Sequence, residues 1–274
     1  HLPNNILTWF TIRNYGFSDA TEIFIFISGY TAAFVYGRAM LEAGFVIATA
    51  RILRRVWQIY VAHVFLFTIF LAEISYVATR FENPLYSEEM GIMDFLKQPD
   101  VTIIQALLLK FKPVNMDVLP LYIVLLLWFA PILWLLLRSP SLGLIVSAAI
   151  YTLSYLFDWN FPAYPSGHWA FNPFAWQLLF VIGAWCALGG ATRLSRWSTS
   201  RVVVGLAFAY LMFAFSIAMT WYFPALGAYV PAFIGEAIYP IDKANLDVLR
   251  ILHFLSLAVI TVWLVPQDWP ALKS

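Results

Sequence analysis

Two carboxylates open the first long apolar stretch of the chain, where buried charge is costly and therefore a candidate for function. Asp19 and Glu22 are three residues apart, which places both side chains on one face of a helix. The same spacing is typical of a capping box, in which the two side chains bond the backbone of the helix start. Alternatively, one carboxylate orients a histidine or a substrate hydroxyl, as the acid of a catalytic triad does. The two roles are compatible.

Three histidines offer proton-transfer chemistry, because an imidazole titrates at about pH 6.5. His1 stands at the start of the sequence, and the residues around it give little reason by themselves to assign it a catalytic role. His63 lies within an apolar stretch, where a hydrogen-bonded packing role is the simpler interpretation. His253 follows Arg250 at the start of the last apolar stretch and is a candidate to support a substrate site.

Glu73 and Arg250 are the other ionisable side chains in apolar surroundings that we select. A lone carboxylate at position 73 must find a partner or remain protonated. Arg250 follows Asp247 by three residues, so an ion pair between them is the simple explanation. The alternative is that Arg250 contacts an anionic group of a substrate.

The composition places these residues in a membrane protein. Hydrophobic residues make up 62% of the 274 positions and charged residues only 11%, against about 25% charged residues in a soluble domain. Sixteen basic and fifteen acidic residues leave a net charge of +1, which argues against nucleic-acid binding. Cys186 is the single cysteine, so neither an intrachain disulfide nor a cysteine-cluster metal site is expected.

Apolar runs close to the length of about 20 residues that crosses a bilayer predict an all-α, polytopic transmembrane bundle forming a single domain over residues 1–274. No repeat or composition break divides the chain. About seven spans are expected, at Phe17–Tyr36, Val56–Ala78, Val118–Leu137, Leu142–Phe157, Pro173–Leu188, Val202–Phe223 and Leu246–Val265.

The distribution of arginines between these runs predicts the orientation of the chain. Basic residues concentrate in alternate links, which the positive-inside rule assigns to the cytoplasm. They are Arg38, Arg51, Arg54, Arg55, Arg138, Arg193, Arg196 and Arg201. The other links carry most of the acidic residues and are expected outside, together with residues 1–16.

Two of the expected outer links have distinctive sequences. Val101–Lys112 is predicted to form an amphipathic helix at the membrane surface. The link 158–172 contains five aromatic rings and no lysine or arginine. Such rings either anchor the chain among lipid headgroups or offer flat faces to a sugar. The candidates for a sugar-facing rim are Trp159, Tyr164, His168 and Trp169.

No phosphate-binding loop, dinucleotide-binding glycine pattern, nucleophile elbow or cluster of metal ligands occurs in the sequence. The cluster of Arg51, Arg54 and Arg55 is in the simplest interpretation a topology signal. Because guanidinium groups bind phosphate in a bidentate manner, the cluster is also a candidate site for the phosphates of an anionic donor.

The stretch Phe24-Ile25-Phe26-Ile27-Ser28-Gly29-Tyr30 resembles the Phe-Phe-x-x-Ser-Gly-Phe signature of the acyltransferase 3 superfamily of membrane acyltransferases. Further stretches resemble the OpgC family of that superfamily and extend over almost the whole chain. They are residues 1–4 (HLPN), 15–20 (YGFSDA), 22–24 (EIF), 54–63 (RRVWQIYVAH), 171–177 (FNPFAWQ) and 250–254 (RILHF).

This resemblance implies a multi-pass enzyme of the bacterial inner membrane that succinylates osmoregulated periplasmic glucans, with its acceptor site facing the periplasm. It implies an acyl-CoA co-substrate, with succinyl-CoA as the expected donor, and no permanently bound cofactor or metal. His1 matches the histidine that superfamily members use as a general base. Because such proteins have about ten spans, an N-terminal helix and C-terminal spans are expected to be missing from this sequence.

The residues and the resemblance together suggest one scheme. His1 removes the proton of a glucan hydroxyl, Asp19 or Glu22 orients His1 or the sugar, and Arg250 contacts the succinyl carboxylate. Arg51, Arg54 and Arg55 bind the donor phosphates, while His253 and Glu73 support the substrate site. A transporter of a small anion or an acylated molecule is the alternative, although the inverted repeats common in transporters are absent from the sequence. A purely structural membrane protein is disfavoured, because burying these charged residues costs desolvation free energy and a structural role would not require them.

Overall fold

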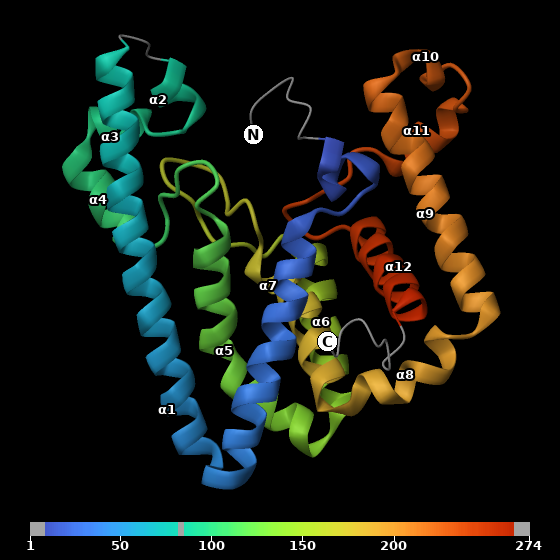
Figure 1. The fold of residues 1–274 in the computed structure, drawn as a ribbon. Coiled ribbons are helices and arrows are strands. Elements are labelled where there is room, and N and C mark those ends of the chain that lie inside the picture. The colour runs from blue at the N-terminus through green and yellow to red at the C-terminus, as the bar shows by residue number, and fades with distance from the viewer. Residues whose placement is uncertain (1–8, 82–84, 266–274) are drawn as a thin grey trace, which may run out of the picture.

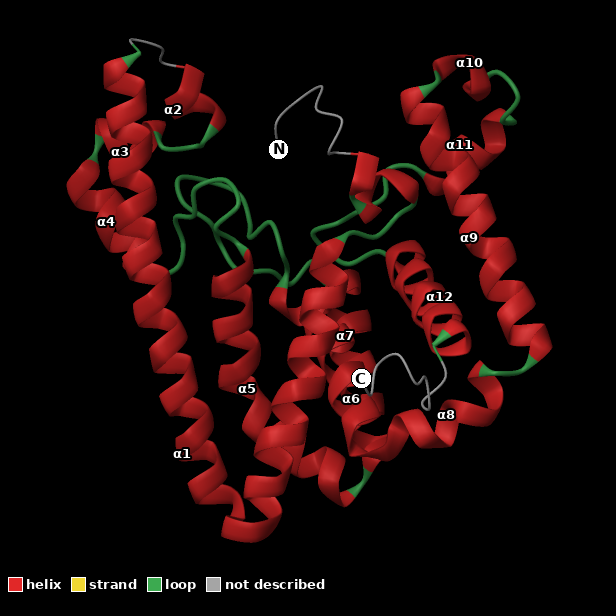
Figure 2. Ribbon diagram, in the orientation of Figure 1, coloured by secondary structure: helices red, strands yellow, loops and turns green. Residues whose placement is uncertain are grey.

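The computed structural model describes residues 9–81 and 85–265, and regular structure in these ranges is helical apart from one isolated bridge between Pro162 and His168 (Figure 2). The all-α prediction is confirmed. The elements are η2 (Ile12–Tyr15), α1 (Ala20–Arg80), α2 (Leu85–Glu89), α3 (Met93–Lys97), α4 (Pro99–Leu107), α5 (Val118–Arg138), α6 (Pro140–Leu156), α7 (Pro173–Trp185), η3 (Cys186–Gly190), α8 (Ala191–Ser198), α9 (Arg201–Tyr222), α10 (Pro224–Gly227), α11 (Ala232–Ile238) and α12 (Val248–Leu264).

Four helical segments in the described ranges are long and apolar enough to cross a membrane, which corrects the expected seven. They are α1, α5, the continuous segment Pro173–Ser195 and α9. The count differs because the first two apolar runs lie in one helical element, α1. The fourth and seventh runs form α6 and α12, apolar helices of 17 residues each.

The first of these elements, α1, is a helical hairpin and not a straight rod. Its 61 residues contain one break in helical geometry, at Gly44, where φ is 85° and ψ is 171°. A positive φ of this size is readily adopted only by glycine. The chain descends to this break and then returns along α5 (Figure 1).

The links that carry the arginines lie together at one end of the bundle. The Gly44 break, the α5–α6 link with Arg138, and α8 with Arg193 all lie at the lower end in Figure 1. The N-terminal part of the described chain, the link between α6 and α7, and the segment before α12 lie at the other end. The helices therefore alternate in direction, as the charge distribution predicts.

The centre of the core is the crossing of α1 with α7 and α5. Gly29 and Gly183 allow the closest approach of α1 and α7. A Cβ atom at Gly29 would lie 1.9 Å from the Phe180 carbonyl oxygen, and one at Gly183 would lie 2.1 Å from the Phe26 carbonyl oxygen. Small residues at such crossings let helix backbones pack directly. The glycine of the Ser28-Gly29 pair is thus a packing residue.

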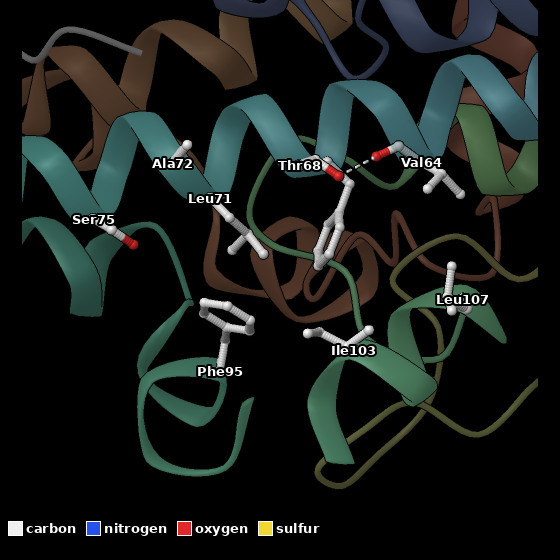
Figure 3. A pocket seen from close by; sticks show the side chains of 9 residues that line it. Val64, Thr68, Leu71, Ala72, Ser75, Phe95, Ile103 and Leu107 are labelled. Carbon is white, nitrogen blue, oxygen red and sulfur yellow. Dashed lines mark hydrogen bonds between the residues drawn. The ribbon is translucent and has the colours of Figure 1, made fainter. Parts of the chain in front are cut away.

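The outer half of α1 carries the short helices α2 to α4. A cavity of about 400 Å³ separates α1 from α3 and α4, and its lining is almost entirely apolar (Figure 3). Leu71 of α1 points toward Phe95 of α3 there, and Ile103 of α4 lies beside this pair. The surface helix predicted over 101–112 is shorter and shifted, because Leu109 adopts a positive φ of 59° that stops α4 before the two lysines.

Candidate functional site

The site begins at the first turn of α1, where the backbone itself fixes two carboxylates. Asp19 is the N-cap and accepts a hydrogen bond from the Thr21 N–H at 2.8 Å. Glu22 accepts one from the Asp19 N–H at 2.8 Å. The predicted capping box is therefore confirmed, and it orients both carboxylates before any tertiary contact is made.

Arg250 of α12 completes this pair of carboxylates. Its guanidinium lies 2.5 Å from Glu22 Oε1 through Nη2, and 3.4 Å from Asp19 Oδ2. The Nε atom of Arg250 donates to Glu22 Oε1 at 2.7 Å. Glu22 and Arg250 are both buried, so the ion pair is shielded from water. The pairing of Arg250 with Asp247 that the sequence suggested is wrong, since the Asp247 side chain instead caps α12 at the Leu249 N–H.

Lys243 brings a second cation to Asp19, at 2.6 Å from Oδ2. The turn that carries it is held against the start of α7, where the Asn172 N–H and the Trp176 indole N–H both donate to the Ala244 carbonyl. Asp242 accepts hydrogen bonds from the Ala244 and Asn245 backbone within the same turn. The position of Lys243 is thus set by backbone contacts.

The electrostatics at Asp19 favour its charged form. Burial alone would raise the pKa of this carboxyl, but the hydrogen bonds from Lys243 and Thr21 outweigh burial and hold the pKa well below its usual range. Asp19 is therefore ionised at any physiological pH. It acts as a fixed negative charge between two cations.

His253 lies one turn beyond Arg250 on the same buried face of α12. Its Nδ1 atom is 2.7 Å from the Ser18 hydroxyl oxygen and 3.3 Å from the Ser18 backbone nitrogen. The imidazole packs directly on Gly16, where a Cβ atom would lie only 1.9 Å from Nε2. Glycine at position 16 is required for this contact because any side chain would occupy the space of the ring.

A cavity of about 410 Å³ opens beside these groups. Its lining combines charge with aromatic surface and comes from residues before α1, the end of α9, the segment before α12 and the first turn of α12. The lining residues include Arg13, Ser18, Asp19, Trp221, Tyr222, Tyr239, Lys243 and Arg250. A bound molecule would therefore meet both cations and ring faces.

Three of the predicted site residues, Asp19, Glu22 and Arg250, are joined in one cluster, and His253 lies beside it. His1 lies outside the described residues. Glu73 is exposed on the outer half of α1, and no interaction in the described ranges joins it to this cluster. The three arginines that are candidates to bind the donor phosphates are exposed on α1, toward the opposite end of the bundle. They are Arg51, Arg54 and Arg55.

The aromatic link between α6 and α7 is divided between surface and interior. Trp159 and His168 are exposed, as a sugar-facing rim requires. Trp169 is only 4% exposed, with the Lys112 ammonium 3.8 Å from its ring centroid. The expectation that Trp169 belongs to an exposed rim is therefore wrong. None of these three residues lines the cavity beside Asp19.

Sequence reasoning missed several residues of the site. Lys243 is one of a few cations in an expected outer link with mostly acidic charges, and no pattern in the sequence marks Ser18 or Gly16 for chemistry. The aromatic lining from Trp221, Tyr222 and Tyr239 was also missed. The only local signal was the Gly16-Phe17-Ser18 string within a stretch that resembles the OpgC family.

These observations define a multi-pass helical membrane protein with an ionic site at one end of its bundle. The sequence profile of the OpgC protein family matches residues 1–274, and the chain belongs to this family. Family membership indicates an acyltransferase with a glucan succinylation-type function. No curated protein and no solved structure matches the chain.

Proposed function

We propose that the chain is an O-acyltransferase that moves a succinyl group from an acyl thioester to a hydroxyl of a periplasmic glucan, and that the cavity beside Asp19 binds the reacting groups. The observation that carries this proposal is the lining of that cavity. It offers cations for a carboxylate and aromatic faces for a sugar within one space of about 410 Å³.

The cationic part of the lining suits the free carboxylate of a succinyl group. Arg13, Lys243 and Arg250 line the cavity together with a single carboxylate, Asp19, among the described residues. Glu22, which does not line the cavity, neutralises part of the Arg250 charge through their ion pair. An excess of positive charge at a partly enclosed surface favours an anionic ligand.

The aromatic part of the lining suits a sugar. Trp221, Tyr222 and Tyr239 present rings with polar edges, and such rings bind the apolar faces of sugars while their polar atoms bond hydroxyls. The Tyr222 hydroxyl donates to Asn14 Oδ1 at 2.6 Å, which fixes this ring at the cavity wall.

For the proton transfer we retain His1 as the general base that deprotonates the glucan hydroxyl, as the family resemblance implies. A base in this role contributes about 10²–10⁴-fold to the rate. Asp19 and Glu22 serve by holding Lys243 and Arg250 in place. Arg51, Arg54 and Arg55 bind the phosphates of acyl-CoA at the cytoplasmic end, and the acceptor side faces the periplasm of a bacterial inner membrane.

Mass spectrometry of periplasmic glucans tests the proposal. The full-length protein is expressed in a glucan-producing bacterium that lacks its own succinyltransferase, alongside His1→Ala, Lys243→Met and the control Lys97→Met, which removes an exposed lysine from the end of α3. We expect succinylated glucans with the parent and the control, and a loss of this modification with the other two. Unmodified glucans despite normal expression of the parent would overturn the proposal in favour of transport.

A further inference from the structure

Ser18 and His253 form a buried pair with the hydrogen-bond polarity of a nucleophile and its base. The Ser18 backbone N–H donates to His253 Nδ1 at 3.3 Å. Since an N–H group can only donate, Nδ1 carries a free lone pair and the ring proton resides on Nε2. The Ser18 hydroxyl oxygen lies 2.7 Å from the same nitrogen, and in this tautomer the hydroxyl donates to the lone pair that the backbone N–H also contacts. This is the arrangement that activates a serine hydroxyl.

One member of the pair lies at the wall of the cavity beside Asp19. Ser18 lines the cavity beside Asp19, whereas His253 lies behind it and away from the lining. Gly16 leaves room for the imidazole to approach from behind, and the ring of Phe17 packs near it with a centroid distance of 6.0 Å. Ser18 thus belongs to the wall of the cavity, and its base, which does not line the cavity, lies against the Ser18 hydroxyl.

The same cavity supplies positive charge for the oxyanion of acyl transfer. Arg250 lines it together with Ser18. Cations near a developing oxyanion lower the barrier of such a reaction when they are fixed in advance. Here Glu22 and Asp19 fix the Arg250 guanidinium.

From this geometry we infer that Ser18 is an acyl-carrying nucleophile, so that succinyl transfer proceeds through an ester on Ser18 Oγ. The inference rests on the proposed function, because it requires an acyl thioester donor and a hydroxyl acceptor. It divides the reaction into two steps.

In the first step, Ser18 Oγ attacks the thioester carbonyl carbon and His253 Nδ1 takes the hydroxyl proton. The Oγ–C bond forms, the C–S bond breaks, and the proton on His253 passes to the departing thiolate. In the second step, the glucan oxygen attacks the ester carbon while His1 takes the glucan proton. The C–Oγ bond breaks, and Ser18 Oγ regains the proton that left the glucan hydroxyl. One thioester and one alcohol thus yield one ester and one thiol.

Trapping of the ester tests the inference. The purified full-length protein in lipid nanodiscs is incubated with succinyl-CoA without glucan, quenched in acid and digested, and the peptide that contains Ser18 is analysed by mass spectrometry. We expect a succinyl adduct on Ser18 that disappears when glucan is added before the quench. Ser18→Ala should carry no adduct, and His253→Ala should form it at least about 100-fold more slowly. The control Ser216→Ala, which removes an exposed hydroxyl on α9, should behave as the parent.

The outcomes separate this inference from the proposed function. Succinylated glucans made by the parent, with no adduct on Ser18 and with Ser18→Ala within about twofold of parental activity, would overturn the acyl-serine step and leave the proposed function intact. Parent protein that modifies no glucan would overturn the proposed function itself. Ser18→Cys guards against a folding defect in Ser18→Ala, since a thiol can accept the acyl group as a thioester.

Discussion

Arg250 Nη2 lies 2.5 Å from Glu22 Oε1, although 228 residues separate the two in sequence. Both side chains are buried, and a second carboxylate, Asp19, also contacts the guanidinium at 3.4 Å. The contact joins the start of α1 to the start of α12. It thus connects the first and last described α-helices at the end of the bundle where the cavity lies.

Removing one partner of this ion pair should destabilise the protein strongly. Glu22→Gln leaves the Arg250 charge buried with only its weaker contact to Asp19, and loss of one partner of a buried pair costs about 3–5 kcal/mol. Thermal unfolding of the protein in nanodiscs measures the effect. Arg38→Gln is the matched control, because it breaks an exposed ion pair with Glu42 on the same helix and should leave the unfolding midpoint unchanged. Equal shifts of the unfolding midpoint for the two variants would contradict the conclusion that the buried Glu22–Arg250 pair stabilises the protein.

Gly16→Ala should destabilise the protein by about 1–3 kcal/mol, the usual range for overpacking. The cause is specific, since the new methyl group would overlap the His253 imidazole. If this overlap is the cause, Gly16→Ala should cost much less in a His253→Ala background than alone, as a double-mutant cycle of unfolding free energies would show. Additive effects would mean that Gly16 is needed for another reason.

The close α1–α7 crossing predicts that two Gly→Ala substitutions within helices change the stability of the protein in opposite directions. Gly29→Ala drives a methyl group into the Phe180 carbonyl and should destabilise the protein. Gly205→Ala, at a position on α9 with no atoms within 4 Å of the new Cβ, should be neutral or stabilising by up to about 1 kcal/mol. Unfolding midpoints of the two variants against the parent test this difference, and a loss of stability in both would argue against close helix packing at Gly29.

Lys112 predicts a pH dependence of stability. Burial lowers the pKa of its ammonium to about 8 from 10.5, with Asp117 opposing the shift. Between these two values the unfolded chain holds a proton that the folded protein has released, so stability should rise as the pH increases from about 8 to about 10.5. Denaturation at a series of pH values measures the slope, and Lys112→Met should flatten it. Lys97→Met should not, because its side chain is exposed.

Lys243→Met should affect succinyl transfer more than acetyl transfer. Both acyl groups need the same carbonyl chemistry, but only succinyl carries a carboxylate for the cation beside Asp19 to bind. We expect kcat/KM to fall at least about tenfold more with a succinyl thioester than with an acetyl thioester, which corresponds to about 1.4 kcal/mol. Equal losses with both donors would assign Lys243 a role in the reaction common to both.

Much of the fold and part of the site could be predicted from the sequence. Composition and the length of the apolar runs predicted the helices, and the spacing of Asp19 and Glu22 predicted the capping box that the structure confirms. Both rest on local interactions, which a sequence displays directly. The span count failed because Gly44 does not separate the first two apolar runs into two elements, and because α6 and α12 are only 17 residues long.

What the sequence could not supply was the pairing between distant segments. Arg250 has an acidic residue three positions before it, yet its partners are at positions 19 and 22. Lys243 and Ser18 acquire their roles only when the segment before α12 docks on α7 and α12 docks on the start of α1. No local sequence pattern shows such contacts, because they form only when the helices of the complete bundle pack together.

The distance in sequence between Glu22 and Arg250 has a consequence for biogenesis. A ribosome completes the first apolar helix long before it synthesises the arginine that neutralises the carboxylate within it. The helix must therefore enter the bilayer with that carboxylate unpaired, protonated or held at the water boundary, until α12 arrives. Assembly of the ionic cluster is thus a late event in membrane insertion, and chains that end before α12 leave Glu22 without its partner Arg250.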